Sequence, residues 1–288
     1  MGEDTLSKVP IRNAMTIDVE DYFQVSAFAP YIRREDWPII HCRVERNVER
    51  ILDLLQRAGV HATFFTLGWI AQRYPAMVRR IVAGGHELAS HGYAHRRASE
   101  QSPAEFASDI GTSKHILEQI GGQIVRGYRA PSFSIGAGNL WALDALQAAG
   151  YHYSSSIYPI LHDHYGMPGA PRFAFYPNGA HGLLELPIST VRLLRRNLPA
   201  GGGGYFRFFP YALSRSLLRR INSHDNQAGI FYFHPWELDP EQPRQHGIGL
   251  KTHFRHYVNL HRMEDRITAL THDFHWDRMD RIFLENAR

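Results

Sequence analysis

The chain has 288 residues, of which 44% are hydrophobic and 12% aromatic, enough for a sizeable core in one large domain or two small ones. Its net charge is only +4 and no long basic run is present, which argues against a dedicated nucleic-acid-binding protein. The single cysteine, Cys42, excludes an internal disulfide and a metal site built from several thiolates.

Nothing in the sequence predicts a targeting or membrane-spanning segment. Residues 1–13 are polar and charged and lack the apolar stretch of a signal peptide. No apolar run reaches the length needed to cross a bilayer. We therefore expect a cytoplasmic chain without a membrane span, and the sequence leaves the oligomeric state open.

Apolar strands and amphipathic helices alternate along the first half of the chain. Ser102 and Glu105 form a capping box with Pro103 at the first helical position, which predicts a helix ending at the glycine pair 121–122. Other helices are expected over 44–59 and 70–85, and strands over 14–18, 61–67 and the residues before Ser90.

The second half is less regular. It is expected to contain strands at 124–131, 151–157, 183–188 and 229–234, a helix over 139–150 and a long loop over 159–177. The glycine-rich stretch 201–207 is interpreted as a flexible linker, a plain loop or a sugar-facing lid. An amphipathic helix should follow residue 250, with solvent-facing histidines at 253, 256, 261, 272 and 275.

This alternation predicts an α/β fold with a mostly parallel sheet and helices outside it, either a barrel or a doubly wound sheet. We expect one catalytic domain over 1–288, with a core of about 14–240 and a helical extension over 241–288. In such folds the chemistry lies at the carboxyl ends of the strands. Asp18, His91 and Arg129 each follow a predicted strand.

Two short stretches carry the residue types of a metal site. Asp18, Glu20 and Asp21 crowd one strand end, which is costly without a cation or solvent, so the alternative is a solvated acidic turn. If the chain turns helical after Ser90, His91 and His95 share a face and can hold one divalent ion. Alone, that pair is weak evidence, and two surface histidines on a helix would be the favoured interpretation.

Four motifs follow one another along the chain: the acidic strand end, Ser90-His91 with His95, Arg129-Ala130-Pro131 and the strand-end His234. In this order they resemble the motifs of the polysaccharide deacetylases of the NodB-homology type, carbohydrate esterase family 4. The resemblance covers about residues 14–239. Residues 18–23, 201–207 and 234–240 are similar to a subgroup associated with bacterial exopolysaccharide and exosortase loci. The fold that this resemblance implies is a distorted (β/α) barrel with fewer than eight complete units.

The resemblance implies a role for each motif residue. Asp18 would be the general base, oriented by Arg129, and His234 the general acid. Glu20, His91 and His95 would bind the metal. The family usually has two adjacent aspartates here, so Asp21 is the alternative carboxylate ligand. Residues 154–156 are serines where relatives often begin with an aspartate, which is a second departure from the family pattern.

The expected function is metal-dependent removal of N-acetyl groups from the amino sugars of a polysaccharide or oligosaccharide. Such hydrolysis needs activated water, charge stabilisation and a proton for the leaving amine, but no covalent nucleophile. Zn²⁺ is the first choice of metal, with Co²⁺, Ni²⁺ or Mn²⁺ as alternatives. The competing hypotheses are a hydrolase of cyclic amides such as ureides on the same scaffold, and a non-catalytic carbohydrate-binding or metal-binding protein.

Overall fold

The computed structural model describes residues 10–163, 165–177, 179 and 182–285. The expectation about a signal peptide drew mainly on residues 1–9, which lie outside the described residues. Within the described ranges, no helix combines the length and the apolar character needed to span a bilayer.

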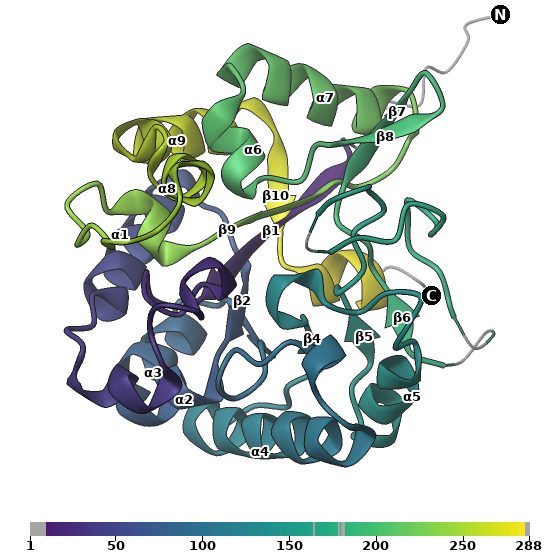
Figure 1. The fold of residues 1–288 in the computed structure, drawn as a ribbon. Helices are drawn as coiled ribbons and strands as arrows, with labels where there is room; N and C mark the ends of the chain where they lie inside the picture. Colours follow the sequence, from purple (N-terminus) through teal and green to yellow (C-terminus); the bar gives the residue numbers. More distant parts are fainter. Residues whose placement is uncertain (1–9, 164, 178, 180–181, 286–288) are drawn as a thin grey trace, which may run out of the picture.

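A curled parallel sheet forms the centre of the molecule (Figure 1). Its strands run in the order β10-β1-β2-β3-β4-β5-β6, and β9 also pairs with β1. The strands are β1 (Arg12–Val19), β2 (Thr63–Thr66), β3 (Glu87–Ser90), β4 (Gly127–Tyr128), β5 (Tyr153–Ser154), β6 (Leu184–Glu185), β9 (Ile230–Phe233) and β10 (His275–Asp277). The predicted α/β class is therefore confirmed.

Strand β1 is the axis of the sheet because it is paired along both edges. Ala14 is level with Ile230 of β9 and with Asp277 of β10, and Thr16 is level with Tyr232 of β9 and Thr63 of β2. Strands β10 and β2 therefore follow one another along the same edge, with β9 on the other. The strand is buried from Asn13 to Val19, so its residues are apolar apart from those that bind neighbouring strands.

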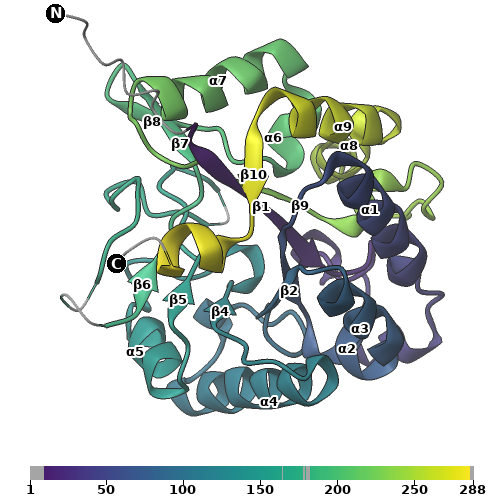
Figure 2. The ribbon, with the colours of Figure 1, turned by 180° about the vertical axis from the view of Figure 1, so that it is seen from behind.

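The helices lie outside the strands, as Figures 1 and 2 show. They are α1 (Val44–Ala58), α2 (Gly68–Arg73), α3 (Pro75–Ala83), α4 (Pro103–Gly121), α5 (Trp141–Ala148), α6 (Gly203–Phe208), α7 (Tyr211–Ser223), α8 (Leu250–Tyr257) and α9 (Met263–Asp273). Short helical turns are η1 (Ser26–Phe28), η2 (Arg34–Ile39), η3 (Ala98–Glu100), η4 (Pro131–Phe133), η5 (Pro235–Leu238), η6 (Leu260–Arg262) and the π-type η7 (Arg281–Glu285).

Local sequence signals explain most helix ends. The capping box of Ser102 and Glu105 begins α4, and Gly59, in the left-handed region at φ 64°, ends α1. The single helix predicted over 70–85 was wrong, because the chain leaves helical geometry at Tyr74. A residue before proline is pushed away from the helical region, and Pro75 then starts α3.

The sheet does not close by strand pairing alone, since β6 and β9 are not paired in the described part of the chain. The hairpin of β7 (Thr190–Leu193) and β8 (Arg196–Pro199) is a separate two-stranded sheet, and the stretch before α6 lies beside β9. Gly202 is bridged to Tyr232 of β9, and a Cβ atom on it would lie 2.1 Å from the Tyr232 carbonyl oxygen. The linker, plain-loop and lid interpretations of 201–207 were therefore wrong, whereas a distorted barrel with fewer than eight complete units is confirmed.

The segment after residue 240 is not purely helical, which corrects the prediction of a helical extension. Helices α8 and α9 are present, but β10 follows them and joins the main sheet. The reason is non-local: β10 occupies the edge of β1 at Arg12–Ala14, before β2 begins to pair at Thr16. A three-residue strand of this kind carries too little periodicity to be seen in sequence.

Candidate metal and hydrolytic site

The predicted site residues meet at the carboxyl ends of the strands. Asp18 ends β1 and Glu20 follows it, His91 and His95 follow β3, Arg129 follows β4, and His234 follows β9. All of these side chains except His234 are at most 5% exposed, and the His234 side chain is 18% exposed. The arrangement gives a buried polar centre with one more accessible imidazole at its edge.

Glu20, His91 and His95 form a cluster that could hold a metal ion. One potential ligand atom from each lies within 4.8 Å of the others. Glu20 Oε2 lies 2.7 Å from His95 Nε2, yet this buried oxygen has no partner in hydrogen-bond geometry among the described residues. A buried acceptor without a donor is costly, and a cation between the two groups would remove that cost. The donor set of one carboxylate and two imidazoles therefore fits a divalent ion.

The two histidines are positioned by a loop, so the predicted helix after Ser90 was wrong. His95 has a positive φ of 51°, and its ring centroid lies 5.4 Å from that of His91. His91 Nδ1 hydrogen bonds the Arg129 carbonyl oxygen at 2.8 Å, which fixes that nitrogen as the donor and leaves Nε2 as the ligand atom. Burial lowers the pKa of His91 to about 4, so its ring is neutral at neutral pH, as a metal ligand must be.

The two candidate carboxylates point to different places. Burial opposes ionisation of Glu20, but nearby His95 and the other imidazoles outweigh it and lower its pKa to about 2. Glu20 Oε1 also accepts a hydrogen bond of 3.1 Å from Trp236 Nε1. Asp21 instead accepts hydrogen bonds from the backbone N–H groups of Arg43 and Val44 at the start of α1, outside the cluster.

Asp18 forms a buried ion pair with Arg129. Arg129 Nη1 donates to Asp18 Oδ1 at 2.6 Å and to Thr16 Oγ1 at 2.8 Å. The guanidinium also donates to the carbonyl and the hydroxyl of Ser155. With so many partners, Arg129 is held rigidly, and it fixes one Asp18 oxygen while the other remains directed at His234. Of the three serines that depart from the family pattern, Ser155 therefore acts here as an Arg129 partner.

His234 faces both carboxylates from across the site. Its Nε2 lies 4.0 Å from Asp18 Oδ2 and 3.7 Å from Glu20 Oε1, while Nδ1 binds Glu237 at 2.7 Å. Burial lowers the pKa of His234, but the Glu237 hydrogen bond and the nearby carboxylates outweigh it and raise that pKa to about 9. The ring is therefore protonated at neutral pH.

Sequence reasoning missed the residues behind His234. His256, predicted to face solvent, is 5% exposed and stacks on Trp236 at a centroid distance of 4.2 Å, which corrects that prediction. Arg207 and Glu237 form a buried ion pair. The spacing of His234 and Glu237, three residues apart after a strand, was the available signal. No local pattern indicates the partners at 207 and 256, because they come from other elements.

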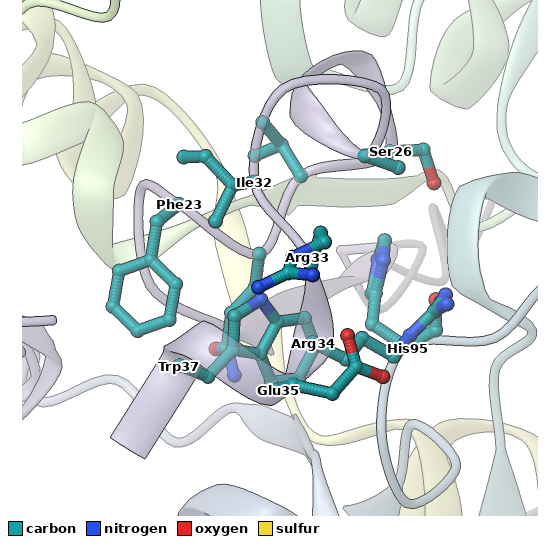
Figure 3. A pocket seen from close by; sticks show the side chains of 11 residues that line it. Phe23, Ser26, Ile32, Arg33, Arg34, Glu35, Trp37 and His95 are labelled. Atoms are coloured by element: carbon teal, nitrogen blue, oxygen red, sulfur yellow. The ribbon is translucent and has the colours of Figure 1, made fainter. Parts of the chain in front are cut away.

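A cavity of about 240 Å³ opens beside His95 (Figure 3). The loop between β1 and α1 forms most of its wall, with the aromatic rings of Phe23 and Trp37 and the charged groups of Arg33, Arg34 and Glu35. Arg34 is fixed to the loop after β3, because it donates to the carbonyl oxygens of Ala94 and His95. The cavity therefore adjoins the metal cluster directly and combines apolar with polar walls.

Comparison with known proteins assigns two regions of the chain. Residues 35–154 match the family model for polysaccharide deacetylase, and residues 155–284 match a domain of unknown function, DUF3473. The chain thus carries a polysaccharide deacetylase domain followed by a DUF3473 region. The two matched regions contain His91, His95 and Arg129 in the first and His234 in the second.

Similar curated proteins are deacetylases. A chitooligosaccharide deacetylase from Bradyrhizobium sp. is 32% identical over 117 residues, covering 40% of this chain and 48% of that protein. A peptidoglycan-N-acetylglucosamine deacetylase from Bacillus cereus is 34% identical over 82 residues, covering 28% and 30%. The chain thus matches less than half of the length of either relative. A putative polysaccharide deacetylase structure from Mycobacterium smegmatis shares the fold, with a TM-score of 0.61, 20% identity and coverage of 95% and 93%.

Proposed function

We propose, on the premise that the chain carries a polysaccharide deacetylase domain, that it removes N-acetyl groups from amino sugars of a bacterial polysaccharide. One observation carries the proposal. A carboxylate with an arginine partner, a Glu-His-His cluster and a protonated imidazole converge within a single buried centre. Amide hydrolysis needs these three functions: a base, a charge-stabilising centre and an acid.

We assign Glu20, His91 and His95 as ligands of a divalent cation, with Zn²⁺ as the first choice. When bound, such an ion supplies a Lewis acid that makes water more acidic and polarises a carbonyl group. Asp21 is an unsuitable ligand because its carboxylate is occupied at the start of α1.

The protein groups account for the proton transfers. Asp18 takes a proton from the water whose oxygen adds to the acetyl carbon, and Arg129 keeps its carboxylate oriented. As the carbon–nitrogen bond breaks, His234 Nε2 gives a proton to the departing amine. Acetate and a free amino sugar result. No step requires a covalent intermediate on the protein.

We further propose that the cavity beside His95 holds the part of the sugar chain next to the reacting acetyl group, and that the natural substrate is an exopolysaccharide. The aromatic and polar walls suit a sugar, whose faces are apolar and whose edges are hydroxylated. The subgroup similarity of residues 18–23 and 234–240 supports the second part.

The test is metal content together with acetate release by the purified wild-type protein. We expect about one divalent ion per chain and acetate from N-acetylglucosamine oligomers, with no hydrolysis of a ureide panel. Ureide hydrolysis without acetate release would support the cyclic amide hydrolase. Oligomer binding without hydrolysis of either substrate in metal-loaded protein would support a non-catalytic binding protein.

A further inference from the structure

The region that matches the domain of unknown function supplies part of the reaction centre. His234 directly follows β9, which pairs with β1 between Ala14 and Ile17. Residues 155–284 thus share one sheet with the strand that carries Asp18. A role for this region can be inferred from the groups that hold His234.

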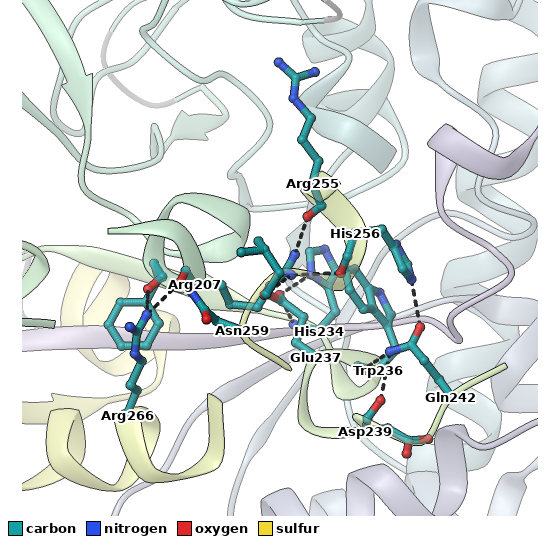
Figure 4. A network of polar contacts seen from close by, with 12 residues as sticks. Arg207, His234, Trp236, Glu237, Asp239, Gln242, Arg255, His256, Asn259 and Arg266 are labelled. Carbon is teal, nitrogen blue, oxygen red and sulfur yellow. Dashed lines mark hydrogen bonds and ion pairs between the residues drawn. The ribbon is translucent and has the colours of Figure 1, made fainter. Parts of the chain in front are cut away.

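Glu237 holds His234 at two points. Its Oε1 accepts the backbone N–H of His234 at 3.0 Å and lies 2.7 Å from Nδ1 (Figure 4). An ionised carboxylate can only accept hydrogen bonds, so Nδ1 carries the proton of this contact. The other ring nitrogen, Nε2, is consequently the one that faces Asp18 and Glu20.

Arg207 holds Glu237 in turn. Its Nε donates to Glu237 Oε2, and the rest of the guanidinium donates to three backbone carbonyl oxygens, those of Arg255, His256 and Val258, at 2.8–3.0 Å. Arg207 is 2% exposed and Glu237 fully buried. A planar guanidinium with five donors suits this set of acceptors, and a lysine ammonium does not.

An aromatic stack restrains the face of the His234 ring. The Trp236 ring lies between His234, at a centroid distance of 5.1 Å and 19°, and His256, at 4.2 Å and 12°. His256 is itself fixed, because Nε2 hydrogen bonds Gln242 Oε1 at 2.7 Å. The ring of His234 is therefore held at Nδ1 and along one face.

We propose that Arg207, acting through Glu237, is a positioning residue that fixes the His234 ring toward Asp18, and that this is a role of the DUF3473 region. The inference rests on the proposed function only in that it treats His234 as the group that protonates the leaving amine. Its geometric part, the orientation of the ring, can be measured without turnover.

The experiment compares Arg207→Met with Arg266→Met. Arg266 also anchors α6, through the carbonyl oxygens of Phe206, Arg207 and Phe209, but none of these hydrogen bonds goes to Glu237 or His234. We expect Arg207→Met to lower acetate release from an N-acetyl amide about ten- to a hundredfold, the usual cost of losing an orienting partner. Hydrolysis of an activated aryl acetate should fall much less, because a good leaving group needs no proton.

The control variant Arg266→Met separates a loss of stability from a loss of His234 positioning. Arg266→Met should lower the melting temperature while leaving the ratio of amide to ester turnover unchanged, and both variants should keep the metal content of the wild type. If Arg207→Met lowers amide and ester turnover equally, Arg207 only stabilises the fold and the inference is wrong. Wild-type protein that releases no acetate would instead contradict the proposed function.

A spectroscopic measurement keeps the inference testable in either case. In protein labelled with ¹⁵N-histidine, the proton on His234 Nδ1 should give a downfield resonance, assigned by its absence in His234→Ala. We expect Arg207→Met to shift or broaden this resonance and Arg266→Met to leave it in place. If Arg207→Met does not fold, Arg207→Lys keeps the buried charge and removes the planar set of donors. A wild-type resonance in either Arg207 variant would overturn the inference.

Discussion

Asp18 and Glu20 are separated by one residue, yet their carboxylates have different surroundings. Asp18 binds the Arg129 guanidinium, whereas Glu20 faces His95 and accepts from Trp236. Two neighbouring carboxylates in different environments can hold different roles in one reaction. This difference allows the base and the proposed metal ligand to be tested separately.

For the base, we expect Asp18→Asn to keep the wild-type metal content and to lower deacetylation by about two to four orders of magnitude, the usual worth of a general base. The amide can still accept the Arg129 hydrogen bond, so the fold should be retained. Turnover and metal content measured on one preparation decide the matter. A parallel loss of metal and activity would make Asp18 a ligand.

For the metal carboxylate, we expect Glu20→Gln to lose metal and Asp21→Asn to retain it. Asp21 should instead contribute to stability, since its carboxylate accepts the backbone N–H groups of Arg43 and Val44. Asparagine has one acceptor oxygen, whereas Asp21 uses both, Oδ1 for the Tyr22 N–H and Oδ2 for the other two, so Asp21→Asn should melt at a lower temperature. Retention of metal by Glu20→Gln and its loss from Asp21→Asn would reverse the assignment.

The two proposed histidine ligands allow a companion measurement. His91→Ala and His95→Ala should each lose metal, with His253→Ala, a change at an exposed histidine of α8, as the matched control. Far-ultraviolet circular dichroism should show that all three variants fold. Full metal retention in both cluster variants would remove the Glu-His-His site from the proposal.

The sequence predicted the residues of this site better than their supports. Asp18 lies near the carboxyl end of an apolar strand, and His91 and Arg129 directly follow two others. Because the carboxyl ends of parallel strands meet at one edge, their convergence follows from local patterns. The burial of His256 does not follow from a local pattern, because the ring that stacks on it, Trp236, comes from a distant strand end. Likewise, the helix expected after Ser90 fails because the ligand geometry is built by a loop with His95 at positive φ.

At the scale of elements, strong periodicity and caps predicted helices such as α1 and α4. Elements that are short or that depend on distant contacts were not predicted. Strand β10 and helix α6 belong to the second group. Helix α6 begins where Gly202 contacts the backbone of Tyr232, and four consecutive glycines carry no propensity for a helix. The order of the chain there depends on non-local contacts, with β9 at the start of α6 and with Arg266 at its end.

The hairpin of β7 and β8 contains a local conflict between sequence and geometry. Leu193 and Arg196 are paired, so Leu194 and Arg195 form a two-residue turn, and both have positive φ, 47° and 66°. Such turns favour Asn-Gly, because bulky side chains are strained in the left-handed region. Leu194 is also 89% exposed, so burial offers little compensation for the strain.

We therefore expect the double substitution Leu194→Asn/Arg195→Gly to raise the free energy of unfolding by about 1 kcal/mol, part of the relieved strain being offset by the entropy of glycine in the unfolded chain. Leu194→Ala, which keeps the strained turn and removes the exposed side chain, is the control and should give no such gain. Denaturant titration of the three proteins measures the effect. A less stable double variant would mean that the tip residues make contacts of their own.

At the scale of the molecule, the chain end secures the side of the sheet opposite the reaction centre. Glu87, at the start of β3, accepts hydrogen bonds from Thr63 of β2, Tyr153 of β5 and the backbone N–H of Asp280. Arg278 donates hydrogen bonds to both carboxylate oxygens of Asp280 and also to the Gly85 carbonyl oxygen. One buried carboxyl group thus links three strands to the segment after β10.

This carboxyl group should make stability depend on pH. Burial, followed by the charge of Asp280, raises the pKa of Glu87 to about 7. The folded state then binds more protons than the unfolded state between pH 4.5 and about 7, so the contribution of Glu87 to stability falls as pH rises through that window. His91 and His256, whose pKa values are lowered by burial, act in the opposite direction below pH 6.5. The net slope of the wild type therefore mixes several groups.

A difference measurement isolates Glu87. The free energy of unfolding of Glu87→Gln minus that of wild type should increase by on the order of 2 kcal/mol from pH 4.5 to pH 8. The reason is that the variant has no carboxyl group to ionise in the interior. Glu241→Gln, a change at an exposed carboxylate, is the control. Denaturant unfolding at several pH values provides both curves. A constant difference for Glu87→Gln would mean that Glu87 is already ionised in the folded protein at pH 5, held as an acceptor by Thr63 and Tyr153.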